Sequence, residues 1–518
     1  MASVQVEQTF WDQGLHNAAL LYFDNKHKEA LDICANLLTA NPKNVKANYL
    51  AGLCLLALNY SDDALTGFAR AAEDFPKVPE YFDALGMAFQ HQGRWTEALA
   101  AYKRSYALAP APWRESNVLW GALHHPKTSA RDLFRAQREY ASHWRTPHVK
   151  VRRNKDPHRK LKIGYISADL RHHSMQSIFG PVYFNHDHDQ FEIHVFSGVN
   201  EIDVHTELYR LAADYWYDAR AIDDKAMANE INKLEIDILV DLSGHSGANR
   251  LHVMTRKPAP VQVSAWGFAI GTGIQEMDYL FTDPIATPPG DFIHETPWYL
   301  PNIVAFNPPR DADDVSPLPY DTNKFITFGY CGRATKATDE VIRVWGRLMR
   351  EVPNSRIFLK DWTYKDPPCQ RRVRTILNEE GIESSRIDFR WNPRDRAGHL
   401  KTAENFDIAL DPWHVNGGAT TLETSWMGVP TLTIRGDRTS SRLGASILTA
   451  LGHEEFIASS IDDMIAKAVD FSGRTDHLRS VRASLRETMR RSVLCDAQSY
   501  CNSVESAYRE MWKLYVGA

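Results

Sequence analysis

The sequence lacks several features that would assign it to a membrane, secreted or nucleic-acid-binding class. No apolar run reaches the roughly 18 residues of a transmembrane helix. The start, MASVQVEQTFWDQG, does not show the basic and then apolar pattern of a signal peptide. The six cysteines have no metal-ligand spacing, which argues against a zinc site and fits a reducing compartment. Because the net charge is −5, we expect a cytoplasmic protein with no nucleic-acid and no membrane partner.

The sequence also lacks the two commonest motifs that bind nucleotide phosphates. There is no Walker loop and no Gly-x-Gly-x-x-Gly after the first predicted strand, which disfavours an NTPase or a dehydrogenase. What it does have is 518 residues, of which 43% are apolar and 24% are charged, a composition typical of globular proteins. A chain of this length exceeds a single core, so we expect roughly two to four domains.

Three columns of small residues or prolines recur every 34 residues near the N-terminus: Ala18, Gly52, Gly86; Ala30, Ala64, Ala98; Pro42, Pro76, Pro110. This period predicts tetratricopeptide helix-turn-helix repeats over residues 1–112, in units at about 11–44, 45–78 and 79–112. Such a stack usually presents a concave surface to a protein or peptide, and we expect it to lie outside any nucleotide site. The alternatives are that it only packs on the rest of the chain or forms a homodimer.

A connector over residues 113–160 separates these repeats from the rest of the chain. It contains an amphipathic helical stretch, Ser129 to Trp144, and then the basic run VKVRRNKDPHRKLK. Since charge runs of this kind are usually solvated, we interpret the basic run as a linker.

From residue 161 onward, apolar runs of strand length alternate with helical or loop segments. The first series is LKIGYIS, FEIHVFS, DILVDLS, PVQVSAW and DYLFTD, and the second is FITFGY, RIFLK, RIDFR, FDIAL and PTLTI. A looser, proline-rich stretch, Pro284 to Pro319, lies between them. The pattern predicts two Rossmann-like lobes with parallel sheets, at 161–319 and 320–518, facing a cleft.

The stretch DPWHVNGGATTLETSWMGVPTLTI, from Asp411 to Ile434, reads as a loop, a short helix and a strand after FDIAL. Gly417 and Gly418 allow close approach of the backbone to a ligand, and the start of the following helix favours an anion. The alternative is that Thr420 and Glu423 form an ordinary capping box and that the glycines only make a turn.

Other predicted strand ends carry residues that could serve the same chemistry. His172 and His173 follow the first strand, and a histidine can act as a base near neutral pH. His245 follows the third strand, and Lys336 opens a helix, where an anion would explain its charge. Basic groups there and in RWNPRDRAGHL, beside a glycine-rich helix start, fit a diphosphate.

The order of these motifs resembles the bacterial branch of the protein O-linked N-acetylglucosaminyltransferase family. The likeness runs through RRNKDPHRKLKIGYISADL, LVDLSGHSGANRL, RKPAPVQVSAWGF, MDYLFTD, EVPNSRIFLK and NGGATTLETSWMGVPTLT. It implies a tetratricopeptide solenoid followed by a GT-B fold. It also implies an inverting transfer of a sugar, N-acetylglucosamine in that family, from a UDP-sugar to Ser or Thr of protein acceptors held through the repeats.

The resemblance also implies roles for individual residues. His173 matches an active-site histidine proposed as the base, His245 lies on a loop bordering the sugar site, and Lys336 contacts the donor phosphates. Arg396 and His399 hold uracil, and Glu423 matches an aspartate on the ribose hydroxyls. The complete donor-binding set that we expect is Arg333, Arg396, His399, Asn416, Gly417, Gly418, Ala419, Thr420 and Glu423.

Departures from the family pattern leave the donor sugar and the acceptor open. Gly267 to Gly271 reads Gly-Phe-Ala-Ile-Gly where the family usually has Gly-Tyr-Pro-Gly-Thr, and Cys331, Gly332 and Arg333 replace Phe-Asn-Asn. The sugar could be N-acetylglucosamine, glucose or another hexose, and the acceptor could be asparagine or a small molecule. A scaffold without activity is an alternative from another class.

The chemistry expected is a single displacement at the anomeric carbon, with Lys336 and the backbone of Gly418 to Thr420 meeting the leaving diphosphate. We therefore expect no metal and no other cofactor. The acidic residues Asp311, Asp313 and Asp314 look superficially like a metal site, but we interpret them as a solvated loop.

Overall fold

The computed structural model describes residues 2–268, 270–309, 312–391 and 396–518. Its internal contacts divide the chain into two compact units. The first contains residues 1–125, 333–346 and 359–392, and the second contains residues 126–332, 347–358 and 393–518.

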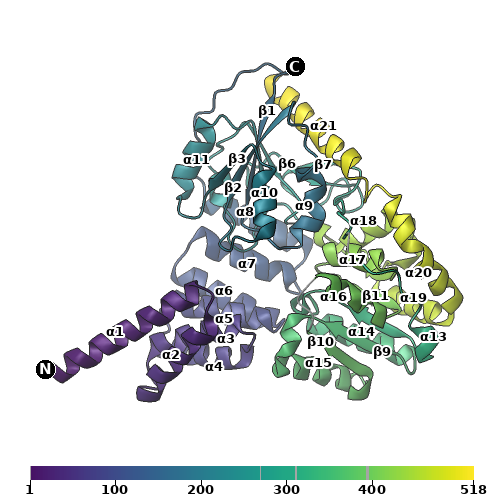
Figure 1. The fold of residues 1–518 in the computed structure, drawn as a ribbon, viewed down its shortest axis with the longest axis horizontal. Helices are drawn as coiled ribbons and strands as arrows, with labels where there is room; N and C mark the ends of the chain where they lie inside the picture. The colour runs from purple at the N-terminus through teal and green to yellow at the C-terminus, as the bar shows by residue number, and fades with distance from the viewer. Residues whose placement is uncertain (1, 269, 310–311, 392–395) are drawn as a thin grey trace. The chain divides into compact units, whose positions relative to one another are not determined.

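Antiparallel helices make up most of the first unit (Figure 1). They are α1 (Ala2–Phe23), α2 (His27–Ala40), α3 (Val45–Ala57), α4 (Ser61–Asp74), α5 (Pro79–His91), α6 (Trp95–Leu108) and α7 (Pro112–His124). The pairs α1 and α2, α3 and α4, and α5 and α6 correspond to the three predicted repeats. The sequence pattern did not predict α7, which follows the last repeat.

The small residues of the repeat columns lie where helices pack closely. Ala30, Ala64 and Ala98 are fully buried. A Cβ on Gly52 would lie 2.5 Å from the ring of Phe68, and a Cβ on Gly86 would lie 2.4 Å from the ring of Tyr102. The two helices of a repeat therefore cross closely only because their contact point carries no side chain.

The remaining segments of the first unit pack against the repeats. They carry η1 (Ala334–Lys336), part of α14 (Asp339–Glu351), η2 (Trp362–Lys365), α15 (Pro367–Glu379), η3 (Ser384–Arg386) and β10 (Ile387–Arg390). The backbone N and Oγ of Ser61 donate to Asp366 Oδ2 at 2.8 and 2.6 Å. This contact fits the alternative that the repeats pack on a later part of the chain, within the same compact unit.

The second unit contains a seven-stranded parallel sheet in the order β3-β2-β1-β4-β5-β6-β7. Its strands are β1 (Leu161–Ser167), β2 (Phe191–Ser197), β3 (Tyr215–Asp218), β4 (Ile238–Asp241), β5 (Val261–Ser264), β6 (Tyr279–Thr282) and β7 (Thr296–Tyr299). The five predicted strands form the buried centre. β3 and β7 are half-exposed edge strands that the prediction missed, and β7 lies in the proline-rich stretch expected to be loose.

A six-stranded sheet has the order β10-β9-β8-β11-β12-β13. Its other strands are β8 (Thr327–Tyr330), β9 (Arg356–Lys360), β11 (Ile408–Leu410), β12 (Thr431–Ile434) and β13 (Ile457–Ala458). β8, β11 and β12 are parallel neighbours, so the loops that follow these three strands leave from one edge of the sheet.

Helices join these strands along the chain. They are α8 (Ala130–His143), α9 (Met175–Tyr183), α10 (Val204–Leu211), α11 (Asp224–Lys233), α12 (Leu251–Met254), α13 (Tyr320–Asn323), α16 (Arg396–Lys401), η4 (Thr402–Asn405), α17 (Ala419–Trp426), η5 (Thr439–Ser441), α18 (Leu443–Ala450), η6 (Glu454–Phe456), α19 (Ile461–Gly473), α20 (Thr475–Arg490) and α21 (Ala497–Val516). The last of these, α21, returns to pack against α9 (Figure 1). No helix among the described residues has both the length and the apolar character needed to cross a membrane.

Two arginines of the basic run after α8 are anchored, whereas Lys150, Arg152, Lys155 and Lys160 are exposed, as expected for a solvated linker. Arg159 donates through Nη1 to Asp237 Oδ2 at 2.8 Å, and the side chain of Asp237 is fully buried. Arg153 has only 2% of its side chain exposed and donates through Nη2 to Ile236 O at 3.0 Å. These contacts fix the basic run against Ile236 and Asp237, the two residues that precede β4.

Candidate active site

The loop between β11 and α17 is held from its inner side. The N–H of Gly417 donates to Asp411 Oδ1 at 2.7 Å, and buried Asn416 donates through Nδ2 to Pro412 O at 2.8 Å. A Cβ on Gly417 would lie 2.5 Å from Thr421 Oγ1. Glycine is therefore required here by close packing within the loop itself.

The first turn of α17 is open to a ligand. The helix begins at Ala419 with Gly418 as its N-cap, and no side chain accepts from its first N–H groups at that cap. The alternative interpretation, a capping box made by Thr420 and Glu423, is therefore wrong. Gly418, Ala419 and Thr420 are half-buried, and the first turn contains no acidic residue. The unsatisfied N–H groups and the helix dipole favour an anion at this position.

Glu423 contacts both residues that were predicted to bind uracil. Its Oε2 lies 3.3 Å from His399 Nε2, and its Oε1 lies 3.6 Å from Arg396 Nε. The exposed fraction of the side chain is 29% for Arg396, 23% for His399 and 14% for Glu423, so all three are sheltered but accessible. The structure thus groups a carboxylate, an imidazole and a guanidinium one turn along α17 from its open end.

The loop after β1 leads into α9, which also contacts Arg396. Arg396 Nη2 donates to Ser177 Oγ in α9 at 3.0 Å. His173 stands four residues before Ser177 and is half-buried, with its Nδ1 accepting from the N–H of Met175 at 3.3 Å. The predicted base and the predicted uracil-binding residues therefore belong to neighbouring segments.

Sequence reasoning missed the residues that support this loop. Asp203 accepts the N–H of His172 at 2.7 Å and also caps α10 through Thr206 N at 2.8 Å. His205 of α10 lies 5.2 Å from His172, centroid to centroid, and burial, His172 and Arg396 lower its pKa. The signal that could have identified Asp203 is its position as N-cap of an amphipathic helix. No local signal identifies Ser177, because its partner is 219 residues away.

His245 is placed inside the protein rather than at an open surface. It is 1% exposed, its Nε2 donates to Thr272 O at 2.7 Å, and Tyr140 and Phe268 pack against the ring. Burial lowers the pKa of His245 to about 4, so the ring is neutral near pH 7. These contacts suit support of the loop around Thr272 better than direct proton transfer. Ala269, one of the departures in that loop, lies outside the described residues.

Lys336 and Arg333 belong to the first compact unit. Lys336 ends the short helix η1 and lies three residues before α14, so the expectation that it opens a helix is wrong. Asp339 and Glu340 occupy the first turn of α14 instead. Lys336 is half-buried, and Arg333 is exposed at the N-cap of η1.

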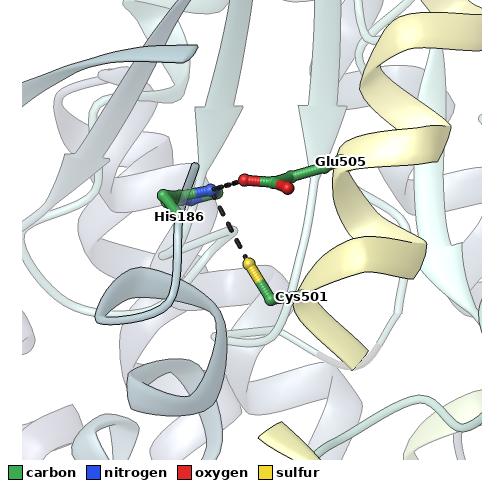
Figure 2. Close-up of side chains that lie close together, drawn as sticks. All are labelled: His186, Cys501 and Glu505. Carbon is green, nitrogen blue, oxygen red and sulfur yellow. Dashed lines mark hydrogen bonds and ion pairs between the residues drawn. The ribbon is translucent and has the colours of Figure 1, made fainter. Parts of the chain in front are cut away.

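Among the described residues, two groups contain residue types that bind metals. Asp313 lies 3.9 Å from Lys401, whereas Asp311 lies outside the described residues. His186, Cys501 and Glu505 cluster between the end of α9 and α21 (Figure 2). His186 bonds to Glu505 through Nδ1 at 3.0 Å and to Tyr165 through Nε2 at 2.8 Å. The buried imidazole therefore uses both nitrogens within the protein.

A model of the protein family described as Glycosyl transferase family 41 matches residues 141–297 and 318–504, and one of tetratricopeptide repeats matches residues 24–88. The chain belongs to glycosyl transferase family 41. The family 41 segments contain β1 to β6, β8 to β13 and every candidate residue of the β1, β4, β8 and β11 loops.

Two curated relatives show how this family 41 protein compares with longer proteins. It is 34% identical to the probable UDP-N-acetylglucosamine–peptide N-acetylglucosaminyltransferase SPINDLY of Arabidopsis thaliana, over 74% of this chain and 43% of that protein. The corresponding protein SEC of Arabidopsis thaliana is 27% identical over 69% of this chain and 38% of its own length. The chain thus spans less than half of the length of these relatives.

A solved structure matches nearly the whole chain. A mutant of the O-GlcNAc transferase of Thermobaculum terrenum is 28% identical and covers 98% of each chain, with a TM-score of 0.93. The predicted fold class, a tetratricopeptide solenoid followed by two Rossmann-like lobes of the GT-B type, is confirmed.

Proposed function

We propose that this family 41 protein is an inverting glycosyltransferase that moves N-acetylglucosamine from UDP-N-acetylglucosamine to serine and threonine hydroxyls of protein acceptors. The observation that carries the proposal is the open N-terminus of α17 beside the group of Arg396, His399 and Glu423. The names of the relatives and of the matching solved protein support the donor and the type of acceptor.

The residues of the second unit suit the two ends of a nucleotide. The N–H groups of Gly418, Ala419 and Thr420 would donate to the diphosphate, since they lie at the positive end of α17. His399 and Arg396 would contact uracil. Glu423 would accept hydrogen bonds from the ribose hydroxyls while it orients both basic side chains.

The reaction is a displacement at the anomeric carbon. The acceptor oxygen forms a bond to that carbon while the bond to the β-phosphate oxygen breaks, and its electron pair leaves with UDP. The hydroxyl proton passes to a base, for which His173 is our candidate. Negative charge grows on the diphosphate, and Lys336, assigned by family resemblance to the donor phosphates, would stabilise it.

Because a lysine and backbone N–H groups can neutralise the leaving diphosphate, the reaction needs no metal ion and no other cofactor. His245 takes a supporting role in this proposal, since its imidazole already donates to Thr272 O. Arg333, which is exposed at the N-cap of η1, is assigned to donor binding by the family resemblance.

The test is intact-mass measurement of a protein acceptor incubated with the full chain and single nucleotide sugars. We expect a mass increase of one N-acetylhexosamine with UDP-N-acetylglucosamine, located on Ser or Thr by fragmentation. Parallel reactions contain UDP-glucose, UDP-galactose and GDP-linked hexoses. Transfer from one of these alone would overturn the donor assignment, and modification of Asn would overturn the acceptor assignment.

The differences from the family pattern at Gly267 to Gly271 and at Cys331 to Arg333 favour a second candidate function, a scaffold that does not turn over a nucleotide sugar. UDP binding does not distinguish the two, because a scaffold could retain the loop at Gly417. Release of UDP from UDP-N-acetylglucosamine distinguishes them, and its absence with every nucleotide sugar would favour the scaffold.

We further assign protein acceptors to the repeats, since tetratricopeptide stacks present extended binding surfaces. A homodimer through the same surface is the alternative, and the mass of the particle in solution separates the two. A cytoplasmic location is supported by the six cysteines, all of which are free of disulfides.

A further inference from the structure

A buried tryptophan of the third repeat bonds to the turn that carries Lys336. Trp95 opens α6, and its indole Nε1 donates to the backbone O of Thr335 at 2.6 Å. Thr335 is the residue before Lys336 in η1. Both partners lie within the first compact unit. One N–H of the repeats therefore fixes the peptide group from which Lys336 extends.

The indole has little freedom to move. Trp95 is 3% exposed and packs with Ala98 and Tyr102 in the core of the third repeat. The ring of His124 stacks on it, with a centroid separation of 4.2 Å and an interplanar angle of 14°. A donor held this firmly defines the position of its acceptor carbonyl.

A second contact holds the other side of the same turn. Arg372 of α15 donates through Nη2 to Ala337 O at 3.2 Å and through Nε to Asp339 Oδ1 at 2.8 Å. Its guanidinium also lies against the backbone of Gly93, where an added Cβ would be 3.1 Å from Nη1. The peptide group before Lys336 is thus bonded directly to the repeats at Thr335 O, and the peptide group after Ala337 is bonded to Arg372, which lies against Gly93.

We propose that Trp95 is a positioning residue for the transfer reaction, which holds Lys336 through the carbonyl of Thr335 in the geometry that stabilises the leaving diphosphate. The inference rests on the proposed function of Lys336. It gives the repeats a role in the chemical step itself, in addition to any role in acceptor binding. Electrostatic stabilisation depends on donors placed before the reaction, so loss of this bond lowers kcat more than donor affinity.

The test uses Trp95→Phe, which keeps an aromatic ring to stack on His124 and removes the N–H. We expect kcat for transfer to fall about 5- to 10-fold, the effect of one hydrogen bond, with UDP affinity within about twofold of the wild type. Trp113→Phe is the matched control, since Trp113 is the second residue of the neighbouring helix α7, is 49% exposed and packs on Arg114. It should leave kcat unchanged.

A double-mutant cycle separates positioning from a general structural effect. In a Lys336→Ala background, Trp95→Phe should change the residual rate less than twofold, because the side chain on which it acts is gone. An equal loss in both backgrounds would overturn the proposal. If Trp95→Phe does not fold, His124→Ala replaces it, since this change loosens the indole and leaves the donor in place.

Hydrogen exchange provides a readout that does not depend on activity. The amides of Lys336 and Thr338, which bond within the turn to Arg333 O and Lys336 O, should exchange at least fivefold faster in Trp95→Phe than in the wild type. Unchanged exchange would overturn the positioning role. Faster exchange in a protein that transfers no sugar would instead contradict the proposed function and leave the mechanical link intact.

Discussion

Glu423 Oε2 lies 3.3 Å from His399 Nε2, and the other oxygen of the same carboxylate lies 3.6 Å from Arg396 Nε. One acidic side chain thus contacts two basic ones that lie three residues apart on one face of α16. Under the proposed function, this one carboxylate would orient both of the side chains assigned to the nucleoside.

Glu423→Gln should weaken UDP binding about 10- to 100-fold, because the ionic contacts that orient Arg396 and His399 are lost. The effect on kcat should be smaller than threefold, since contacts to uracil change little during transfer. Calorimetry and initial rates measure the two quantities. Glu454→Gln, the same change at an exposed carboxylate in η6, is the control. A normal affinity for UDP in the Glu423 variant would contradict the assignment.

Lys336→Ala should reduce turnover more than it weakens binding of the UDP-sugar. The ammonium group sees more negative charge on the diphosphate as the glycosidic bond breaks, so the loss should appear in kcat. By analogy with removing one donor from an oxyanion hole, we expect about 10²–10³-fold. His399→Ala should show the opposite pattern, with weaker UDP binding and a smaller change in kcat. The reverse result for the two variants would require abandoning the mechanism.

Chelation should leave the reaction intact. Transfer measured after dialysis against EDTA should proceed at the rate of the untreated enzyme, because the lysine and the helix start replace a divalent ion at the diphosphate. Magnesium added back should change the rate less than twofold. A chelated enzyme that is inactive until magnesium or manganese returns would refute this view.

Acid should destabilise the wild type more than a variant without His245. Burial depresses the pKa of this histidine from 6.5 to about 4, so the folded protein loses stability as pH falls below the unfolded pKa of 6.5. Between pH 7 and pH 5 the loss is about 2 kcal/mol in the free energy of unfolding. His245→Gln keeps a donor for Thr272 O and removes the titration.

Denaturant unfolding of both proteins at pH 7 and pH 5 tests this difference. Burial raises the pKa of Asp241 to about 6, so protonation of this carboxyl between pH 7 and pH 5 favours the folded state, the opposite of the effect of His245. Asp241 is present in both proteins, so its contribution cancels in the comparison. Parallel pH dependences would show that the histidine is not held neutral.

Deletion of residues 1–112 should reduce donor hydrolysis as well as acceptor modification. The deletion removes Ser61 and Trp95, which bond to Asp366 and Thr335 in the segments that follow β9 and β8. Rates of UDP release with and without a protein acceptor measure the two activities, and circular dichroism checks the fold. A truncated protein with normal hydrolysis would show that the repeats serve acceptor binding alone.

The sequence pattern predicted the strands that are buried on both faces. β1, β2 and β9 begin and end where their apolar runs do, because a central parallel strand needs continuous apolar residues. The pattern missed β7 because this edge strand contains Pro297 and two exposed residues and so has no continuous apolar run. β13 has only two residues, too few for a pattern.

The candidate site was predictable where a motif is local and hidden where a contact is distant. The loop from Asn416 to Thr420 was identified by its glycines and its place before a helix. The bonds of Arg396 to Ser177 and of Trp95 to Thr335 join residues 219 and 240 positions apart. No periodicity or turn signal encodes such pairs, since they depend on how completed elements pack.

The packing of α21 against α9 has a consequence for the order in which the chain folds during synthesis. His186 is translated 319 residues before its partner Glu505. At typical synthesis rates this interval is roughly 16–64 s. Throughout it, the apolar surface and the imidazole that α21 will cover are exposed on the first sheet's flank. The first sheet therefore lacks part of its cover until α21 has been synthesised, so its packing cannot be completed in the order in which its strands emerge.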